Sequence, residues 1–180
     1  MVNEVDRINS VVNDLLTFAR PMEPEPTPTD MMELIKHAVR LVQADAKSHD
    51  VSIRKNISPD LRKISLDTKQ MTQVLLNLLL NSLQEVAERG SIEVGAELDA
   101  SGTRLHLWVE DDGPGIPADT RQKIFDPFFT TREKGTGLGL AIVHKIVENH
   151  SGEIRIDSPL PGKSQGSRFT ITIPVSPDSL

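Results

Sequence analysis

The first twenty residues alternate apolar and polar positions with the period of a helix. The apolar positions are Val5, Ile8, Val12, Leu15 and Ala19, separated by three, four, three and four residues. This spacing is typical of the a and d positions of a coiled coil. Because only two heptads are present, we expect the helix to need partner helices. A lone amphipathic helix packed on its own domain is the alternative interpretation.

The next segment, residues 21–29, is rich in proline. Pro21, Pro24, Pro26 and Pro28 alternate with Met, Glu and Thr. Such a composition cannot form a core and favours extended polyproline geometry. We therefore predict a semi-rigid hinge between the helix, residues 1–20, and a domain that spans residues 30–176.

The remaining residues predict an alternation of helices and strands. Asp30 and Asp67 are each followed three residues later by Glu or Gln, the capping-box pattern of a helix N-terminus, and Gly90 and Gly152 predict helix ends. The expected helices are 30–48, 67–89 and 138–150, and the expected strands are 51–57, 63–66, 91–98, 104–110, 153–157 and 167–174. This order predicts a two-layer α/β sandwich, a mixed sheet packed on three helices.

Composition and charge disfavour several classes of function. The 180 residues carry a formal net charge of −6 and contain no cysteine, which excludes a disulfide, a thiolate metal site and a thiol nucleophile. The net negative charge disfavours nucleic acid as a partner, so binding of an anion would have to be local. No run approaches the roughly 18 apolar residues of a membrane span. We expect a cytoplasmic domain.

The predicted helix 67–89 carries an unusual polar stripe. Most of its surface is apolar, whereas one narrow face carries Gln70, Gln73, Asn77, Asn81, Gln84 and Glu88. A core helix with a solvated edge is the plain interpretation, but such edges usually carry Lys and Glu. Asn77 and Asn81 lie one turn apart, so their side-chain oxygens suit a hard cation together with phosphate oxygens.

A first glycine-containing segment follows the strand 104–110. Asp111 stands at the strand end, and Gly113 and Gly115 allow the backbone to approach a ligand closely. The Asp111 carboxylate can accept hydrogen bonds from a ligand there. An ordinary Asp-Gly turn is the alternative interpretation of this segment alone.

A second glycine cluster leads directly into the last predicted helix. Gly135, Gly137 and Gly139 stand at its start, and a helix N-terminus offers backbone N–H groups to an anion. Two commoner phosphate motifs do not fit. A P-loop that ends at Gly162-Lys163-Ser164 would need glycine where Asp157 stands, and the 135–139 spacing is not the dinucleotide fingerprint.

Between the two glycine clusters, residues 118–136 contain three of the five phenylalanines, Phe125, Phe128 and Phe129, and end in a basic run. Glycines bound this segment on both sides. The pattern predicts a mobile lid that makes few apolar contacts until a phosphate pairs with its basic side chains.

In order and spacing, these segments resemble the N, G1, F and G2 boxes of the sensor histidine kinases. The matching residues are Asn77-Leu-Leu-Leu-Asn81, Asp111-X-Gly-X-Gly115, the Phe-rich lid and Gly135-Thr-Gly-Leu-Gly-Leu140, and Gly166-Ser167-Arg168-Phe169 resembles their last glycine-containing box. The resemblance covers residues 30–174 and implies the Bergerat ATP-binding fold, an α/β sandwich shared with gyrase-type and Hsp90-type ATPases. It assigns residues 1–20 as the second helix of the dimerisation and phosphoacceptor bundle. The leucines before Asn81 and the Phe-Thr-Thr of the lid are most similar to nitrogen-regulation and metal-responsive (zinc) sensor kinases.

The resemblance also implies roles for single residues. Asp111 would accept from the adenine amino group of ATP, Ser167 would support the base through water, Asn81 would bind Mg²⁺, and Asn77 and Lys134 would be catalytic. Asp112 stands where Asn is frequent, and we expect its side chain to face outward. The residues that the resemblance assigns to the nucleotide and Mg²⁺ are Asn77, Asn81, Asp111, Gly113, Gly115, Ile116, Phe128, Thr131, Lys134, Gly135, Thr136, Gly137, Leu138, Gly139, Leu140 and Ser167.

The implied activity is transfer of the ATP γ-phosphate to a histidine in two-component signalling. The phosphoacceptor motif, a His followed by Glu or Asp with Arg-Asn-Pro shortly after, surrounds none of the five histidines. We therefore expect a fragment that does not phosphorylate itself and that works with the phosphoacceptor helix of its own kinase. The other expected partners are a response regulator receiver domain and a second copy in the full-length homodimer. That parent protein would be an inner-membrane sensor, attached through an upstream region.

Alternative functions remain within and outside the kinases. A gyrase-type or Hsp90-type ATPase carries a Glu four residues before its metal-binding Asn, but here that position is Asn77, which cannot accept a proton. The proline hinge after a heptad helix disfavours a serine kinase of the anti-sigma-factor kind. Intact glycine boxes argue against an inactive nucleotide-binding or dimerisation module.

Overall fold

The structure is a computed structural model that describes residues 15, 23–59, 61–132 and 135–175. Apart from Leu15, the predicted helix 1–20 lies outside the described residues. None of the helices in the described part of the chain is long and apolar enough to cross a membrane. In chain order, the elements are β1 (Thr27–Thr29), α2 (Met31–Ser48), β2 (Ser52–Ile57), β3 (Ile64–Leu66), α3 (Thr68–Glu85), β4 (Ser91–Leu98), β5 (Arg104–Asp111), α4 (Gly139–Asn149), β6 (Glu153–Asp157) and β7 (Ser167–Pro174).

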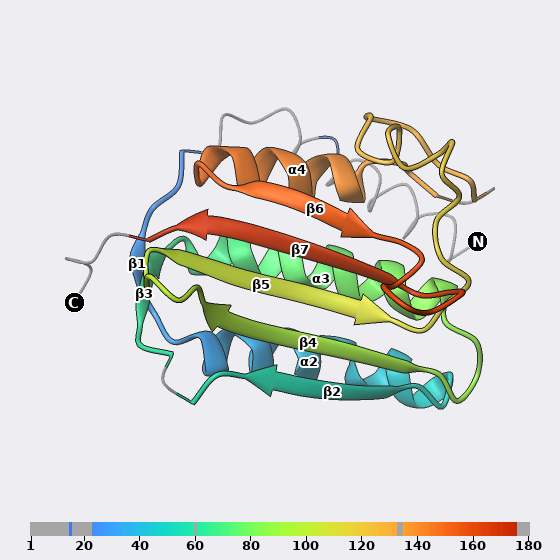
Figure 1. Ribbon diagram of the computed structural model, residues 1–180, viewed down its shortest axis with the longest axis horizontal. Helices are drawn as coiled ribbons and strands as arrows, with labels where there is room; N and C mark the ends of the chain where they lie inside the picture. The colour runs from blue at the N-terminus through green and yellow to red at the C-terminus, as the bar shows by residue number, and fades with distance from the viewer. Residues whose placement is uncertain (1–14, 16–22, 60, 133–134, 176–180) are drawn as a thin grey trace, which may run out of the picture.

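Five of the strands form one mixed sheet in the order β2-β4-β5-β7-β6. Strands β2 and β4 are parallel, whereas β4 with β5, β5 with β7 and β6 with β7 are antiparallel. Helices α2, α3 and α4 cover one face of this sheet and leave the other face open (Figure 1). The predicted two-layer sandwich with a mixed sheet on three helices is thereby confirmed.

The core lies between the sheet and the helices. Along β5, Leu105, Leu107 and Val109 are buried at alternate positions, as the period of a strand requires. In α3, buried Leu75 and Leu79 lie one turn apart on the same face of the helix. Because α3 packs between α2 and α4, it is buried on most sides, and its amide stripe is held in a fixed position.

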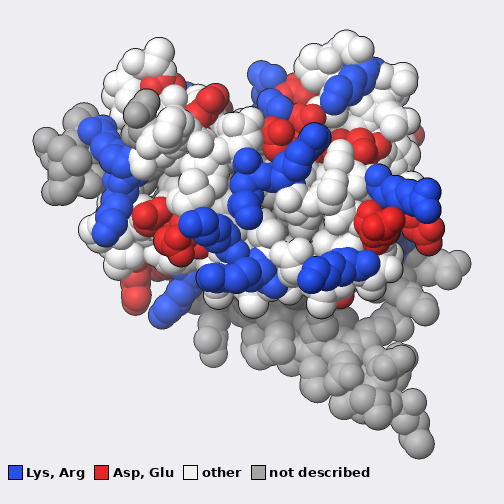
Figure 2. Space-filling model, turned by 90° about the horizontal axis from the view of Figure 1, so that it is seen from below, with Lys and Arg blue, Asp and Glu red and all other residues white. Residues whose placement is uncertain are grey.

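The sheet edge at β2 is protected by charge. Arg54 and Lys55 of β2 are exposed, and β2 has no neighbour on its outer side within the described sheet. Figure 2, which views this side of the molecule, shows many Lys and Arg side chains spread over it. Basic side chains on an edge strand disfavour pairing with another sheet.

The predicted helix N-termini are confirmed. The Asp30 carboxylate accepts hydrogen bonds from the backbone N–H groups of Met32 and Glu33, at 2.9 and 3.2 Å. Asp67 accepts in the same way from the N–H of Gln70 at 3.0 Å. Each carboxylate therefore satisfies backbone donors that have no partner within their own helix.

The predicted end of the second helix is wrong by four residues. Helix α3 ends at Glu85 instead of Arg89, and Val86 takes an extended conformation that places its side chain in the core. Arg89, with φ +65°, makes the left-handed turn that was expected of Gly90. Gly90 serves close packing instead, because a Cβ there would lie 2.0 Å from Cγ1 of Val86.

The end of the predicted hinge 21–29 forms a strand. Thr27–Thr29 is β1, which pairs antiparallel with β3. Just before it, the backbone N–H of Glu25 donates to Oδ2 of Asp67 at 3.0 Å. The chain is extended there, as expected, but contacts distant in sequence join residues 27–29 to the domain.

Candidate functional site

A cavity of about 580 Å³ lies between α3, the loop after β5 and the loop before α4. It brings together most of the residues predicted from the motifs. Gly113, Phe128 and Leu138 were also predicted, but they do not line it, and Lys134 lies outside the described residues. The predicted residues that line the cavity are Asn77, Asn81, Asp111, Gly115, Ile116, Thr131, Gly135, Thr136, Gly137, Gly139, Leu140 and Ser167.

One end of the cavity holds the buried carboxylate of Asp111, the last residue of β5. The residue is 4% exposed. Oδ2 accepts from the Ser82 hydroxyl at 3.0 Å, and Oδ1 accepts from the Gly113 N–H at 3.1 Å. Burial raises the pKa of Asp111, although hydrogen bonds from Ser82, Gly113 and Ser167 oppose the rise. An ionised carboxylate accepts about four hydrogen bonds, so Asp111 can still accept one from a ligand.

Serine hydroxyls organise the loop beside Asp111. The Ser158 hydroxyl accepts from the N–H of Ile116 at 2.7 Å and donates to the carbonyl of Gly166 at 3.0 Å. It also lies 3.2 Å from the hydroxyl of Ser167, which lines the cavity. A side chain at Gly115, where φ is +86°, would crowd the Ser158 hydroxyl at 3.0 Å. The loop can therefore approach a ligand only with glycine at this position.

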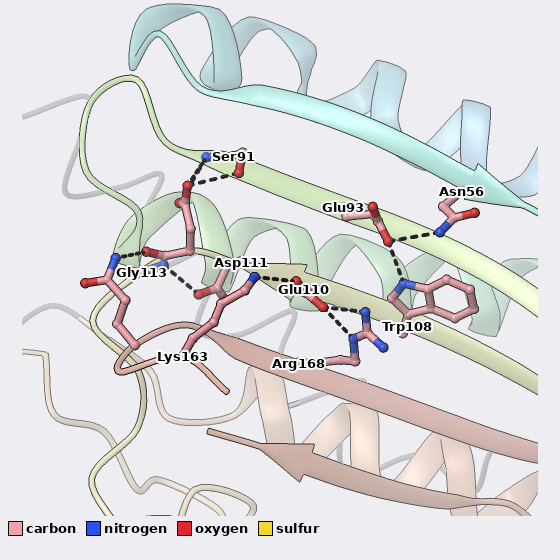
Figure 3. A network of polar contacts seen from close by, with 11 residues as sticks. Asn56, Ser91, Glu93, Trp108, Glu110, Asp111, Gly113, Lys163 and Arg168 are labelled. Carbon is pink, nitrogen blue, oxygen red and sulfur yellow. Dashed lines mark hydrogen bonds and ion pairs between the residues drawn. The ribbon is translucent and has the colours of Figure 1, made fainter. Parts of the chain in front are cut away.

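The alternation of β5 separates the cavity from the open face of the sheet. Glu110, next to Asp111, points to the open face, where it pairs with Arg168 and Lys163 (Figure 3). The Asp112 carboxylate faces away from the cavity and accepts from the N–H and hydroxyl of Ser91, at 3.0 and 2.9 Å. The expectation that Asp112 points outward is therefore confirmed. These contacts fix the strand end that presents Asp111 to the cavity.

The other end of the cavity is formed by the amide stripe of α3. The Asn77 side-chain NH₂ donates to the carbonyl of Gly139 at 3.2 Å, which ties α3 to the start of α4. One turn further along, Oδ1 of Asn81 accepts from a guanidinium N–H of Arg132 at 3.1 Å. The Asn81 oxygen thus faces the positively charged guanidinium of Arg132.

The glycine loop reaches α4 without a side-chain cap. Leu138 precedes α4 and its N–H donates to the Thr136 hydroxyl at 3.3 Å, whereas no side chain in the described part of the chain caps the first-turn N–H groups. Gly137 has φ +67°, and a Cβ there would lie 2.4 Å from the carbonyl carbon of Phe128. This close approach brings the loop and the uncapped N-terminus of α4 to the cavity, where an anion would be favoured.

The predicted lid packs against the core more than expected. Ile124 is buried, Phe125 and Phe129 pack against the core, and the Phe125 ring lies 5.3 Å from that of His144. The expectation of few apolar contacts was therefore wrong for these residues, because helix α4 supplies a surface that the sequence did not reveal. Phe128, in contrast, is 63% exposed and does not line the cavity.

Arg132 connects this segment to α3. Its guanidinium pairs with the Glu85 carboxylate, with Nε at 2.9 Å from Oε1, and it also donates to Gln84 and Asn81. Among the described residues that line the cavity, Arg132 is the one basic residue. It lies beside the amide stripe, in contact with Asn81 and Gln84.

Comparison with known proteins assigns the family. The family described as histidine kinase-, DNA gyrase B- and HSP90-like ATPases matches residues 66–177. The chain belongs to this family. Within it, the matched residues include α3 with its amide stripe, the Asp111 strand and the glycine loop, so the family match covers the whole cavity wall described above.

The relatives within the ATPase family are histidine kinases. The chain is 43% identical over 176 residues to the sensor histidine kinase ZraS of Escherichia coli O157:H7, covering 98% of this chain and 37% of that protein's length. Full-length ShkA in complex with AMPPNP has a TM-score of 0.87 and 30% identity, over 97% of this chain and 37% of that one. Histidine kinase ThkA in complex with the response regulator TrrA has a TM-score of 0.80 and 28% identity, over 98% of this chain and 49% of that one.

Several residues of this ATPase-family cavity were not predicted as site residues. Gln84 continues the amide stripe and Arg132 belongs to the basic run, so both carried a signal in the sequence. The apolar residues of the cavity wall carried no such signal, because in the sequence they cannot be distinguished from other core residues. The additional lining residues are Leu80, Gln84, Glu85, Pro117, Thr120, Ile124, Phe129, Thr130, Arg132 and Phe169.

Proposed function

We propose that this domain binds Mg²⁺-ATP in the cavity and transfers the γ-phosphate to a histidine of a phosphoacceptor helix, as a sensor histidine kinase. One observation carries the proposal. A single cavity holds the buried Asp111 carboxylate, the side chains of Asn77 and Asn81, and the start of α4, which no described side chain caps. This arrangement matches a ligand with hydrogen-bond donors at one end and phosphates at the other.

Asp111 is the proposed adenine contact. Its carboxylate lines the cavity and keeps acceptor capacity beyond its bonds to Ser82 and Gly113. Ser167 lies next to it at the start of β7 and would support the base through water. Because Asp111 is buried, a hydrogen bond to it is strengthened by the low local dielectric.

Asn77, Asn81 and the loop before α4 are the proposed phosphate and metal end. The Asn81 oxygen is a hard donor that already faces a cationic group, so it fits one coordination position of Mg²⁺. When bound, Mg²⁺ would neutralise phosphate charge. The N–H groups at the start of α4 would hold phosphate oxygens, and Lys134 is proposed as a further lid cation.

Phosphotransfer is proposed because the relatives are histidine kinases. The chain covers only 37% of the length of ZraS, so the activity and partners of a whole protein are proposals. The structure of ThkA with TrrA supports a response regulator as a partner. The proposal also includes a homodimer and a bundle in which residues 1–20 form the second helix, beside the phosphoacceptor helix. The parent protein is proposed to be a sensor in the inner membrane, with this domain in the cytoplasm. Direct hydrolysis is disfavoured because Asn77 donates its amide to Gly139 and cannot act as a base.

Calorimetry and a transfer assay test the proposal. The purified domain should bind Mg²⁺-ADP and Mg²⁺-AMPPNP, and it should phosphorylate a histidine on a supplied phosphoacceptor bundle slowly. Release of free phosphate without transfer would favour an ATPase instead. Absence of nucleotide binding in a folded sample would refute the site.

A further inference from the structure

The guanidinium of Arg132 occupies the cavity at the position proposed for the metal. Its Nη2 donates to Oδ1 of Asn81 at 3.1 Å and to the Asn81 carbonyl at 3.4 Å. The same guanidinium pairs with the Glu85 carboxylate and donates to the Gln84 side-chain oxygen. Four oxygen atoms from the last two turns of α3 thus surround one cationic group.

Two features hold Arg132 there. The Glu85 carboxylate lies one turn after Asn81 on α3, so it supplies a negative charge beside the amide oxygen. On the other side, the Arg132 N–H donates to the Thr130 hydroxyl at 3.1 Å, and the Gly135 N–H donates to the Arg132 carbonyl at 3.2 Å. These two hydrogen bonds hold the backbone of Arg132, from which the guanidinium extends toward α3.

A guanidinium and a divalent cation cannot share the Asn81 oxygen. Arginine stays protonated at any relevant pH, and two cations at one oxygen repel each other. We propose that Arg132 and Glu85 form a latch in which the Arg132 guanidinium holds the Asn81 oxygen that Mg²⁺ would need. Binding of Mg²⁺-nucleotide must displace it. This inference rests on the proposed function, because it assigns the metal position to Asn81.

The size of the effect follows from the exposure of the pair. The side chains of Arg132 and Glu85 are 32% and 42% exposed. Partly exposed ion pairs change an equilibrium by a factor of up to about five. Apparent affinity falls in proportion to the fraction of molecules that are competent to bind. Weakening the latch should therefore tighten Mg²⁺-ADP binding about two- to fivefold.

The test replaces the charge of Glu85 and keeps its shape. Calorimetric titration with Mg²⁺-ADP compares the wild type, Glu85→Gln, Arg132→Gln and the double variant. Glu88→Gln is the control, because it makes the same charge change at an exposed residue just beyond α3. We expect tighter binding for Glu85→Gln, no change for Glu88→Gln, and no effect of Glu85→Gln in the Arg132→Gln background. Amide hydrogen exchange of residues 128–132 without nucleotide should be faster in Glu85→Gln.

Other outcomes would overturn the latch. Weaker Mg²⁺-ADP binding by Glu85→Gln would indicate that Glu85 is part of the metal site. Unchanged nucleotide binding and unchanged hydrogen exchange would show that the Arg132–Glu85 pair does not control nucleotide binding. Tighter binding that persists in the Arg132→Gln background would mean that Glu85 acts by repelling nucleotide charge directly. If the wild type binds no nucleotide, the proposed function fails; if it binds and Glu85→Gln does not bind more tightly, only the latch fails.

Discussion

Replacement of Asp111 by Asn tests the adenine end of the cavity with the smallest possible change in shape. The two carboxylate oxygens accept from Ser82 and Gly113, and the carboxylate lines the cavity with acceptor capacity left for a ligand. An asparagine keeps one acceptor, which the buried Gly113 N–H requires. Its NH₂ group then meets the adenine amino group, so two donors face each other.

The expected loss follows from the hydrogen bond that disappears. A hydrogen bond to a charged group contributes about 1.5–3 kcal/mol, which corresponds to roughly 10- to 150-fold weaker binding. The asparagine NH₂ should also tolerate a carbonyl in place of an amino group. We therefore expect Asp111→Asn to narrow the preference for ADP over GDP, because guanine carries a carbonyl at that position.

The fold itself should survive this substitution. Burial raises the pKa of Asp111, so its ionised form costs folding free energy at every pH above the raised pKa, and this cost is relieved as the pH falls toward the unfolded value. A neutral asparagine removes the cost, and the melting temperature at pH 7 should not fall. In the wild type, nucleotide affinity should fall as the pH is lowered through the pKa of Asp111, which lies above that of an ordinary aspartate. The Asp111→Asn variant should lack this fall in affinity.

Calorimetry with ADP and GDP, alongside thermal unfolding of the same samples, decides the matter. Ser101→Ala is a suitable control, because Ser101 lies exposed in the turn between β4 and β5, far from the cavity in the sheet. An Asp111→Asn protein that melts normally and keeps both the affinity and the adenine preference of the wild type would refute the assignment.

Three further predictions concern the proposed Mg²⁺ ligand, the open face of the sheet and phosphorylation of histidine. Asn81→Ala should lower ADP affinity in Mg²⁺ to the level measured in EDTA, and a Mg²⁺ effect of wild-type size in this variant would contradict the metal assignment. Gly95→Ala should destabilise the domain by about 1–3 kcal/mol in urea unfolding, because the added Cβ would lie 1.9 Å from the Trp108 ring; a concurrent Trp108→Leu should restore part of the loss, and a Gly95→Ala protein of unchanged stability would show that the packing is not tight. The chain alone should acquire no acid-labile phosphate from ATP, since none of its five histidines has the acceptor context; a labelled histidine would disprove this.

Local sequence patterns determined most of the secondary structure. Strands at 91–98 and 167–174 agree with the structure because alternation of apolar and polar residues depends only on the two faces of a sheet. The caps at Asp30 and Asp67 were predictable for a similar reason, since a capping side chain contacts backbone within three residues. The amide stripe and the two glycine clusters are also local patterns, and they located most of the cavity wall.

Contacts between distant segments decided the rest. Thr27–Thr29 became a strand because β3 pairs with it, and α3 stopped at Glu85 because Val86 is buried. Ile124 and Phe125 were expected in a loosely packed lid, yet they pack on a core surface that exists only after α4 has docked. No local pattern contains these partners.

The positions of the charged side chains within the cavity could likewise not be predicted from the sequence. Arg132 was visible in the sequence only as part of a basic run, and Glu85 was not predicted as a site residue. Their pairing across 47 residues places a cation on Asn81, and it depends on the tertiary approach of the lid to the last turn of α3. The sequence determined which chemical groups the site contains, because the spacing of those groups is a local pattern. The tertiary fold decided which of them come into contact, because an ion pair forms only between groups that packing brings within a few ångströms.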